Sequence, residues 1–125
     1  MDRPAFDVFA ADCPSRAALE HITGRWGVLV LGGLADGPRR FNELGRRIDG
    51  LSQKMLAQTL HALERDGFVE REVLGTTPPH VVYRLSPTGA AIGAQLMELV
   101  GNLEALMPQV LASRSRYDRQ HPESV

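Results

Sequence analysis

The apolar residues between Leu51 and Asp66 recur every three or four positions, the spacing that gathers side chains along one side of an α-helix. They are Leu51, Met55, Leu56, Leu60 and Leu63. This pattern predicts a helix that packs its apolar stripe against a core and begins with Ser52 as its N-cap. The other positions form a second face of amide, cationic and imidazole side chains with almost no acid, made of Gln53, Lys54, Ala57, Gln58, His61 and Arg65.

Three shorter apolar patterns precede this helix. They predict a first helix over 15–22, an almost wholly apolar helix over 26–34 that would form the centre of the fold, and a short helix over 41–48. A buried strand is the alternative for 26–34, because a short apolar run fits either element. The Asp49-Gly50 turn joins 41–48 to the polar-faced helix. Two helices joined by such a short turn predict a helix-turn-helix.

The pattern changes to that of strands after this helix. Gly67 is expected to end the helix in a left-handed conformation. Residues 68–74 and 80–85 are rich in β-branched and aromatic side chains, and 75–79 contain a glycine and two prolines. We therefore predict a β-hairpin, which would form a wing beside the helix-turn-helix.

A long helix is predicted from Ser86, its N-cap, and Pro87, its first residue, to about residue 111. Its apolar band consists of Ile92, Leu96, Leu99, Val100, Leu103, Leu106, Met107 and Val110. One small domain has too little core to cover this band, so the helix is expected to hold a homodimer together. We therefore predict a mainly α member of the α+β class, a winged helix-turn-helix with a β-hairpin wing and a long C-terminal dimerisation helix.

The two ends of the chain lack a clear period. Residues 1–12 are expected to form an arm, with Phe6, Val8 and Phe9 available to lie on a partner surface. Residues 112–125 are rich in Arg, Ser and Asp and are expected to form a flexible tail. The region between them, 13–111, would form the core of a single domain that spans 1–125, because a chain of this length is too short for two independent cores.

Composition agrees with a soluble globular protein, at 43% hydrophobic and 23% charged residues. No apolar run reaches the roughly 18 residues of a membrane span, and the start of the chain lacks the basic flank of a signal peptide. These observations predict a cytoplasmic protein with no membrane partner.

The net charge of −1 by itself argues weakly against nucleic-acid binding. The charge is unevenly distributed, however. Residues 1–37 hold three Lys/Arg against five Asp/Glu, 38–84 hold eight against six, and 85–125 hold three against four. The middle segment is therefore net +2 and the ends are −2 and −1, which places the positive charge on the predicted helix-turn-helix and wing.

The side chains of this middle segment suit DNA. Gln can bond to adenine edges, while Lys and Arg address guanine edges or phosphates, and Thr and His can donate to phosphates. The same residue types are also common on solvated helix faces, so the pattern alone is weak. The candidate DNA-binding residues are Arg39, Arg40, Ser52, Gln53, Lys54, Gln58, His61, Arg65, Thr76, Thr77 and His80.

No catalytic, metal or cofactor site is predicted. The four His residues lack the spacing of a metal pair, and Ser15, Ser52 and Ser86 are better explained as helix caps than as nucleophiles. Trp26 is more easily explained as a core anchor than as a ligand-stacking residue. Cys13 is the only cysteine. It is either a small buried apolar residue or a reactive thiol, since a position before a helix, with Arg16 one turn in, would lower its pKa.

Several separated blocks of the chain closely resemble the HxlR family of bacterial transcriptional regulators, within the MarR-like superfamily. The blocks lie between Cys13 and residue 107 and are Cys13-Pro14, Gly24-Arg25-Trp26, residues 36–44, residues 51–56, residues 63–71 and residues 78–89. The resemblance implies a winged-helix homodimer held by its terminal helices and bound to a palindromic operator. It also implies that Ser52, Gln53, Lys54 and Gln58 lie on the recognition helix and that 75–80 form the wing tip.

Two features bear on how far the resemblance extends. Family members often have Gly-Gly-Lys-Trp-Thr where this chain has Thr-Gly-Arg-Trp-Gly at 23–27, which would leave the following helix less well capped. Some members sense oxidants or electrophiles through a cysteine whose position Cys13 matches, and others answer small ligands. Two hypotheses follow. One is a dimeric, sequence-specific DNA-binding regulator of a bacterial promoter that responds to such a signal, and the other is a winged-helix protein-interaction module without DNA binding.

Overall fold

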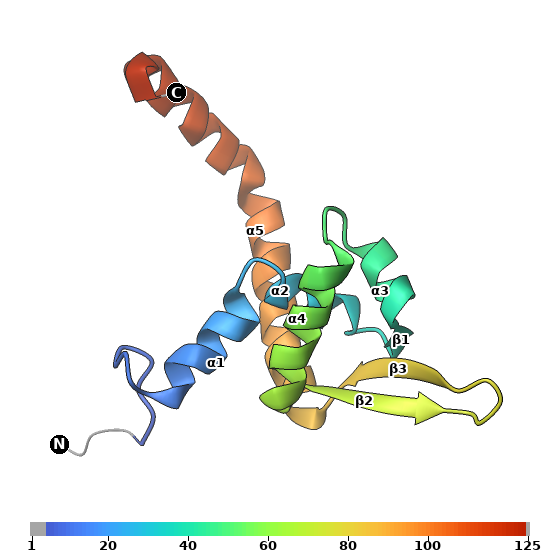
Figure 1. The fold of residues 1–125 in the computed structure, drawn as a ribbon. Helices are drawn as coiled ribbons and strands as arrows, with labels where there is room; N and C mark the ends of the chain where they lie inside the picture. The colour runs from blue at the N-terminus through green and yellow to red at the C-terminus, as the bar shows by residue number, and fades with distance from the viewer. Residues whose placement is uncertain (1–4, 125) are drawn as a thin grey trace.

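Helix α2 (Gly27–Gly33) lies at the centre of the fold and contacts α1 (Pro14–Thr23), α4 (Gln53–Arg65) and α5 (Pro87–Gln120). The computed structural model describes residues 5–124, and Figure 1 shows α2 behind α4 and beside α5. The segment is therefore a helix and not the alternative strand. Val30 and Leu31 of α2 are fully buried, as its apolar sequence predicts.

The start of α2 has no side-chain cap. Trp26 is its N-cap residue and makes no capping hydrogen bond. The Trp26 side chain is half-buried and packs against the core. A Cβ built on Gly27 would lie 1.9 Å from the carbonyl oxygen of His21, so α2 begins too close to α1 for any larger residue.

Helix α1 begins one residue earlier than predicted. Its N-cap is Cys13 and not Ser15, because Pro14 occupies the first helical position, where its missing N–H costs nothing. Its last turn is tied to the end of α4, since Nδ1 of His21 lies 2.5 Å from Oδ2 of Asp66. In the arm, residues 1–4 lie outside the described part of the chain, and Phe6 and Phe9 are 68% and 88% exposed.

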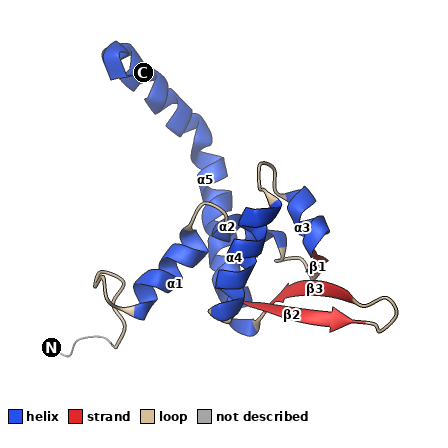
Figure 2. Ribbon diagram, in the orientation of Figure 1, coloured by secondary structure: helices blue, strands red, loops and turns tan. Residues whose placement is uncertain are grey.

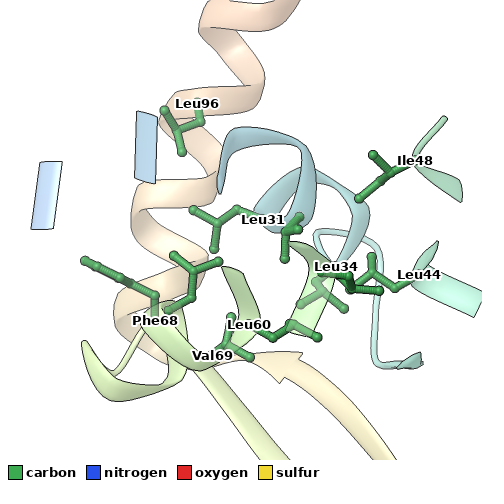
Figure 3. Close-up of a cluster of buried hydrophobic side chains, with 11 residues drawn as sticks. Leu31, Leu34, Leu44, Ile48, Leu60, Phe68, Val69 and Leu96 are labelled. Atoms are coloured by element: carbon green, nitrogen blue, oxygen red, sulfur yellow. The ribbon is translucent and has the colours of Figure 1, made fainter. Parts of the chain in front are cut away.

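The helix-turn-helix consists of α3 (Phe41–Arg47) and α4. The apolar residues of both helices meet those of α2, β2 and α5 in one cluster, shown in Figure 3. Its members are Val30, Leu31, Leu34, Leu44, Ile48, Leu56, Leu60, Leu63, Phe68, Val69 and Leu96. Met55, which the spacing assigns to the buried stripe, is instead 38% exposed, because it lies toward α1 at the edge of the cluster.

The sheet has three antiparallel strands in the order β1 (Arg39–Arg40), β3 (His80–Leu85), β2 (Val69–Leu74). Strands β2 and β3 form the predicted hairpin, with Val69 opposite Leu85 and Leu74 opposite His80. Figure 2 shows this wing extending away from the helices. Gly67 has φ +81°, so the left-handed end of α4 is confirmed. The fold is thus the predicted mainly α winged helix-turn-helix.

Ser86 joins the wing to α5. Its Oγ donates to the carbonyl of Gly67 at 2.5 Å and accepts from the N–H of Gly89 at 3.0 Å, which confirms it as the N-cap. A Cβ on Gly89 would lie 1.8 Å from the carbonyl oxygen of Phe68. Helix α5 therefore starts in direct backbone contact with the segment that follows α4.

The prediction of a flexible tail over 112–125 is wrong for most of that segment. Helix α5 continues to Gln120 and is followed by a 3₁₀ turn over Pro122–Ser124. The segment 112–120 contains no glycine or proline, and it includes three Arg, one Ala and one Gln, which are strong helix formers. Its lack of apolar period indicates only that it does not pack on the core. Within the described residues, no helix is both long and apolar enough to cross a membrane.

Candidate nucleic-acid interface

The exposed face of α4 is the centre of the candidate interface. The Oγ of Ser52 accepts from the N–H of Met55 at 3.1 Å, which confirms it as the N-cap. Leu56, Leu60 and Leu63 are buried, and this packing holds the helix so that its other side points to solvent. We call that side the reading face, which comprises the exposed residues Gln53, Lys54, Gln58, His61 and Arg65. The only acidic residue of α4 is Glu64, in its last turn.

Helix α3 lies on one side of α4 and adds cations to it. An open hollow of about 320 Å³ between the two helices is lined by Asn42 and Arg46 of α3 and by Ser52 and Gln53 at the start of α4. Arg40, the N-cap of α3, is exposed, and its backbone N–H donates to Oε1 of Glu43 at 3.0 Å. The structure thus brings predicted residues together with Asn42 and Arg46, which were not among the candidates.

Arg39 is differently placed from its neighbour Arg40. Its Nε donates to the carbonyl of Gly33 at 2.8 Å, and its Nη2 lies 3.1 Å from Oδ2 of Asp36. The hydrogen bond from Arg39 is the main reason that the pKa of Asp36 is lowered. The Arg39 guanidinium is therefore already engaged within the chain, where it supports the turn between α2 and α3.

The wing tip carries the remaining candidates. Thr76 and Thr77 are exposed in the loop that joins β2 to β3, whereas His80 is half-buried beside Gly75. Strand β1 pairs Arg40 with Val82 of β3, which links the start of α3 to the wing. This strand was not predicted, because two residues are too few to form an alternating pattern. Its effect is to fix the wing relative to the reading face.

Cys13 lies apart from this surface, at the start of α1, and is half-buried. Its Sγ accepts hydrogen bonds from the hydroxyl of Ser15 at 3.2 Å and from the N–H of Asp7 at 3.3 Å. These hydrogen bonds lower the pKa of the thiol, and the bond from Ser15 has the largest effect. The sequence suggested that Arg16 lowers this pKa. In the structure, however, the Arg16 guanidinium donates to the carbonyls of Val8 and Phe9 and not to Cys13.

Comparison with known proteins identifies the family. Residues 21–113 match the model of the HxlR-like helix-turn-helix. The chain belongs to the HxlR-like family. This confirms the resemblance deduced from the blocks between 13 and 107. Among the described residues of this HxlR-like chain, no group of three or more His, Cys, Asp or Glu could hold a metal ion.

Relatives of this HxlR-like chain are transcriptional regulators. It is 48% identical over 108 residues, 86% of either chain, to the uncharacterized HTH-type transcriptional regulator YtfH of Escherichia coli (strain K12). The putative transcriptional regulator ytfH from Salmonella typhimurium is similar in structure, with a TM-score of 0.82 at 48% identity over 88% of this chain and 98% of that one. The crystal structure of diamide-treated YodB from B. subtilis has a TM-score of 0.63 at 39% identity, and the match covers 80% of this chain and 96% of that one.

Proposed function

We propose that this HxlR-like chain is a homodimeric, sequence-specific DNA-binding regulator of transcription. The observation that carries the proposal is the reading face, an exposed and nearly acid-free side of α4 on a helix-turn-helix. A helix of this kind fits the major groove and reads base edges with its side chains. The relatives described as transcriptional regulators support the same function.

Each part of the surface has a role in this proposal. Gln53 and Gln58 address adenine edges, and Lys54, His61 and Arg65 address guanine edges or phosphates. Arg40, the N-terminus of α4 at Ser52 and the wing tip at Thr76, Thr77 and His80 hold the phosphate backbone. Arg39 contributes by supporting the turn before α3 and not through direct contact.

The dimer is proposed from α5. Leu99, Leu103 and Leu106 are 61%, 52% and 53% exposed, and the second half of α5 extends away from the rest of the domain in Figure 1. A second copy packed along α5 would bury these side chains and place two reading faces on one palindromic operator. The exposed Phe6 and Phe9 of the arm are proposed to share this interface.

The decisive test is binding to a palindromic duplex selected from random-sequence DNA by the purified protein. A regulator binds such a duplex with an affinity that falls steeply with added salt, because bound phosphates release counterions. Binding that is absent or indifferent to salt would favour the second candidate, a winged-helix protein-interaction module, which the near-neutral net charge of −1 allows.

We further propose that the regulator responds to oxidants or electrophiles through Cys13, whose lowered pKa favours the reactive thiolate. The thiol can form a disulfide between two subunits, a mixed disulfide with a small thiol, or an adduct with an electrophile. Each product lies at α1, beside the proposed dimer interface. Movement there would change the spacing of the two recognition helices, which must match half-sites about 34 Å apart.

Diamide tests this response. It accepts the two electrons and two protons released when a pair of thiols forms a disulfide. We expect the parent to release the selected duplex after treatment and Cys13→Ser to retain it. If both proteins keep binding, Cys13 is only a packed side chain, and a non-covalent ligand or constitutive regulation would have to replace this proposal.

A further inference from the structure

Two hollows flank the reading face, one on either side of α4. In Figure 1, α4 lies between α1 and α3. The hollow toward α3 contains Arg46, Ser52 and Gln53 and belongs to the surface already described. The other, here called the α1-side hollow, is open, measures about 520 Å³ and is lined in part by Glu20, Arg25, Trp26, Gly50, Gln58 and Thr59.

Arg25 is the cation of the α1-side hollow. It is exposed, and the carbon of its guanidinium lies 5.0 Å from the centroid of the Trp26 ring. Within residues 5–124 no carboxylate forms an ion pair with it. An arginine stacked on an aromatic face keeps its N–H groups free at the edge, where they can bond to an anion.

The ring below Arg25 is fixed in place. Trp26 packs against the core, and its Cη2 would lie 3.9 Å from a Cβ on Gly50, in the turn between α3 and α4. The guanidinium is thus held beside the turn that positions the recognition helix. Gln58 of the reading face lines the same hollow. Arg25 therefore borders the reading face on the side opposite Arg46.

A helix in the major groove lies between two phosphate backbones, because the groove is only about 12 Å wide. With α3 and the wing on one backbone, the other must pass α4 on the side of α1. Gly24, Gly27 and Gly50 line that side and add no side chains that would obstruct it. We propose that the α1-side hollow receives this second phosphate backbone and that Arg25 is its phosphate ligand. This inference rests on the proposed DNA binding.

Glu20 is the opposing charge in the same hollow. Its carboxylate repels a phosphate, so Arg25 and Glu20 should affect the affinity for DNA in opposite directions. Loss of the positive charge at Arg25 weakens binding to every duplex alike, and loss of the negative charge at Glu20 strengthens it. A purely structural role for the hollow would not produce opposite signs.

The test measures affinity for a fluorescein-labelled random-sequence duplex between about 50 and about 200 mM salt. A lost phosphate contact makes the negative slope of log K against log salt less steep by about 1 for each chain on the DNA, or by about 2 for a dimer. We expect this for Arg25→Ala and recovery of most of the slope in Arg25→Lys, because a phosphate also accepts the point charge of lysine. Arg114→Ala, an equal charge loss far along α5, is the matched control and should keep the parent slope.

A second readout uses Trp26, the only tryptophan of the chain. Its fluorescence should change when the duplex enters the hollow in the parent. Arg25→Ala with the parent slope and an unchanged melting temperature overturns this inference alone and leaves the proposed function intact. A parent protein that binds no duplex overturns both.

Discussion

At the scale of single residues, Gln58 and Lys54 lie one turn apart on the reading face. Their replacement by alanine should affect DNA binding in different ways. Gln58 is expected to bond to a base edge, a contact worth about 1–3 kcal/mol of discrimination. Gln58→Ala should therefore lose preference for the selected duplex over a scrambled one. Lys54→Ala should weaken binding to both duplexes about equally and make the fall of affinity with added salt less steep. Equal losses on both duplexes for Gln58→Ala would contradict its assignment as a base-reading residue.

Gly89 is the residue whose replacement should most directly damage the fold. A Cβ there would lie 1.8 Å from the backbone oxygen of Phe68, and that oxygen accepts the N–H of Ser86. Gly89→Ala is expected to lower the free energy of unfolding by about 1–3 kcal/mol, as forced overpacking does. Gly45→Ala in α3 is the control, because its Cβ would meet Leu56 at an ordinary 3.5 Å. Similar stabilities for the two variants, measured by urea unfolding, would refute this explanation.

At the scale of elements, the wing depends on its loop for function and not for folding. Leu74 and His80 are the last pair of the hairpin, so a two-residue Asn-Gly turn can replace 75–79 without a change of register. This variant should bind the selected duplex roughly ten-fold more weakly, since the phosphate donors Thr76 and Thr77 are removed. Its melting temperature should stay close to that of the parent. Unchanged affinity would make the wing tip a simple connector.

The control for the shortened wing keeps the loop length. A double Thr76→Ala, Thr77→Ala variant removes only the hydroxyl donors. If the threonines contact phosphate, this double variant should lose most of the DNA affinity that the shortened loop loses. If it binds like the parent while the short loop does not, the backbone of the wing makes the contact instead.

At the scale of the whole molecule, assembly depends on the exposed apolar side of α5. Leu103→Glu should shift the protein from dimer to monomer at micromolar concentration, because a dimer would bury this carboxylate without a partner. Ala105→Glu, two residues further and so on the other side of the helix, should leave the dimer intact. Light scattering with size-exclusion chromatography distinguishes the two states. A parent that is a stable, folded monomer would contradict the dimer.

The helix-turn-helix, the wing, the caps at Ser52 and Ser86 and the exposed polar face of α4 could be predicted from sequence, because each depends on local spacing and local hydrogen bonds. Other features emerged only from the folded chain. Strand β1 forms only because β3, far along the chain, pairs with it. The hydrogen bonds of Arg39 to Gly33 and of Ser15 to Cys13 join residues that are close in sequence, but they depend on the backbone path of the turns between them. The helical continuation over 112–120 was missed for another reason, since helix propensity acts without an apolar period. The significance of Arg25 emerged only from the fold, because Arg25 and Gln58 are separated in sequence by all of α2 and α3 but line one hollow in space.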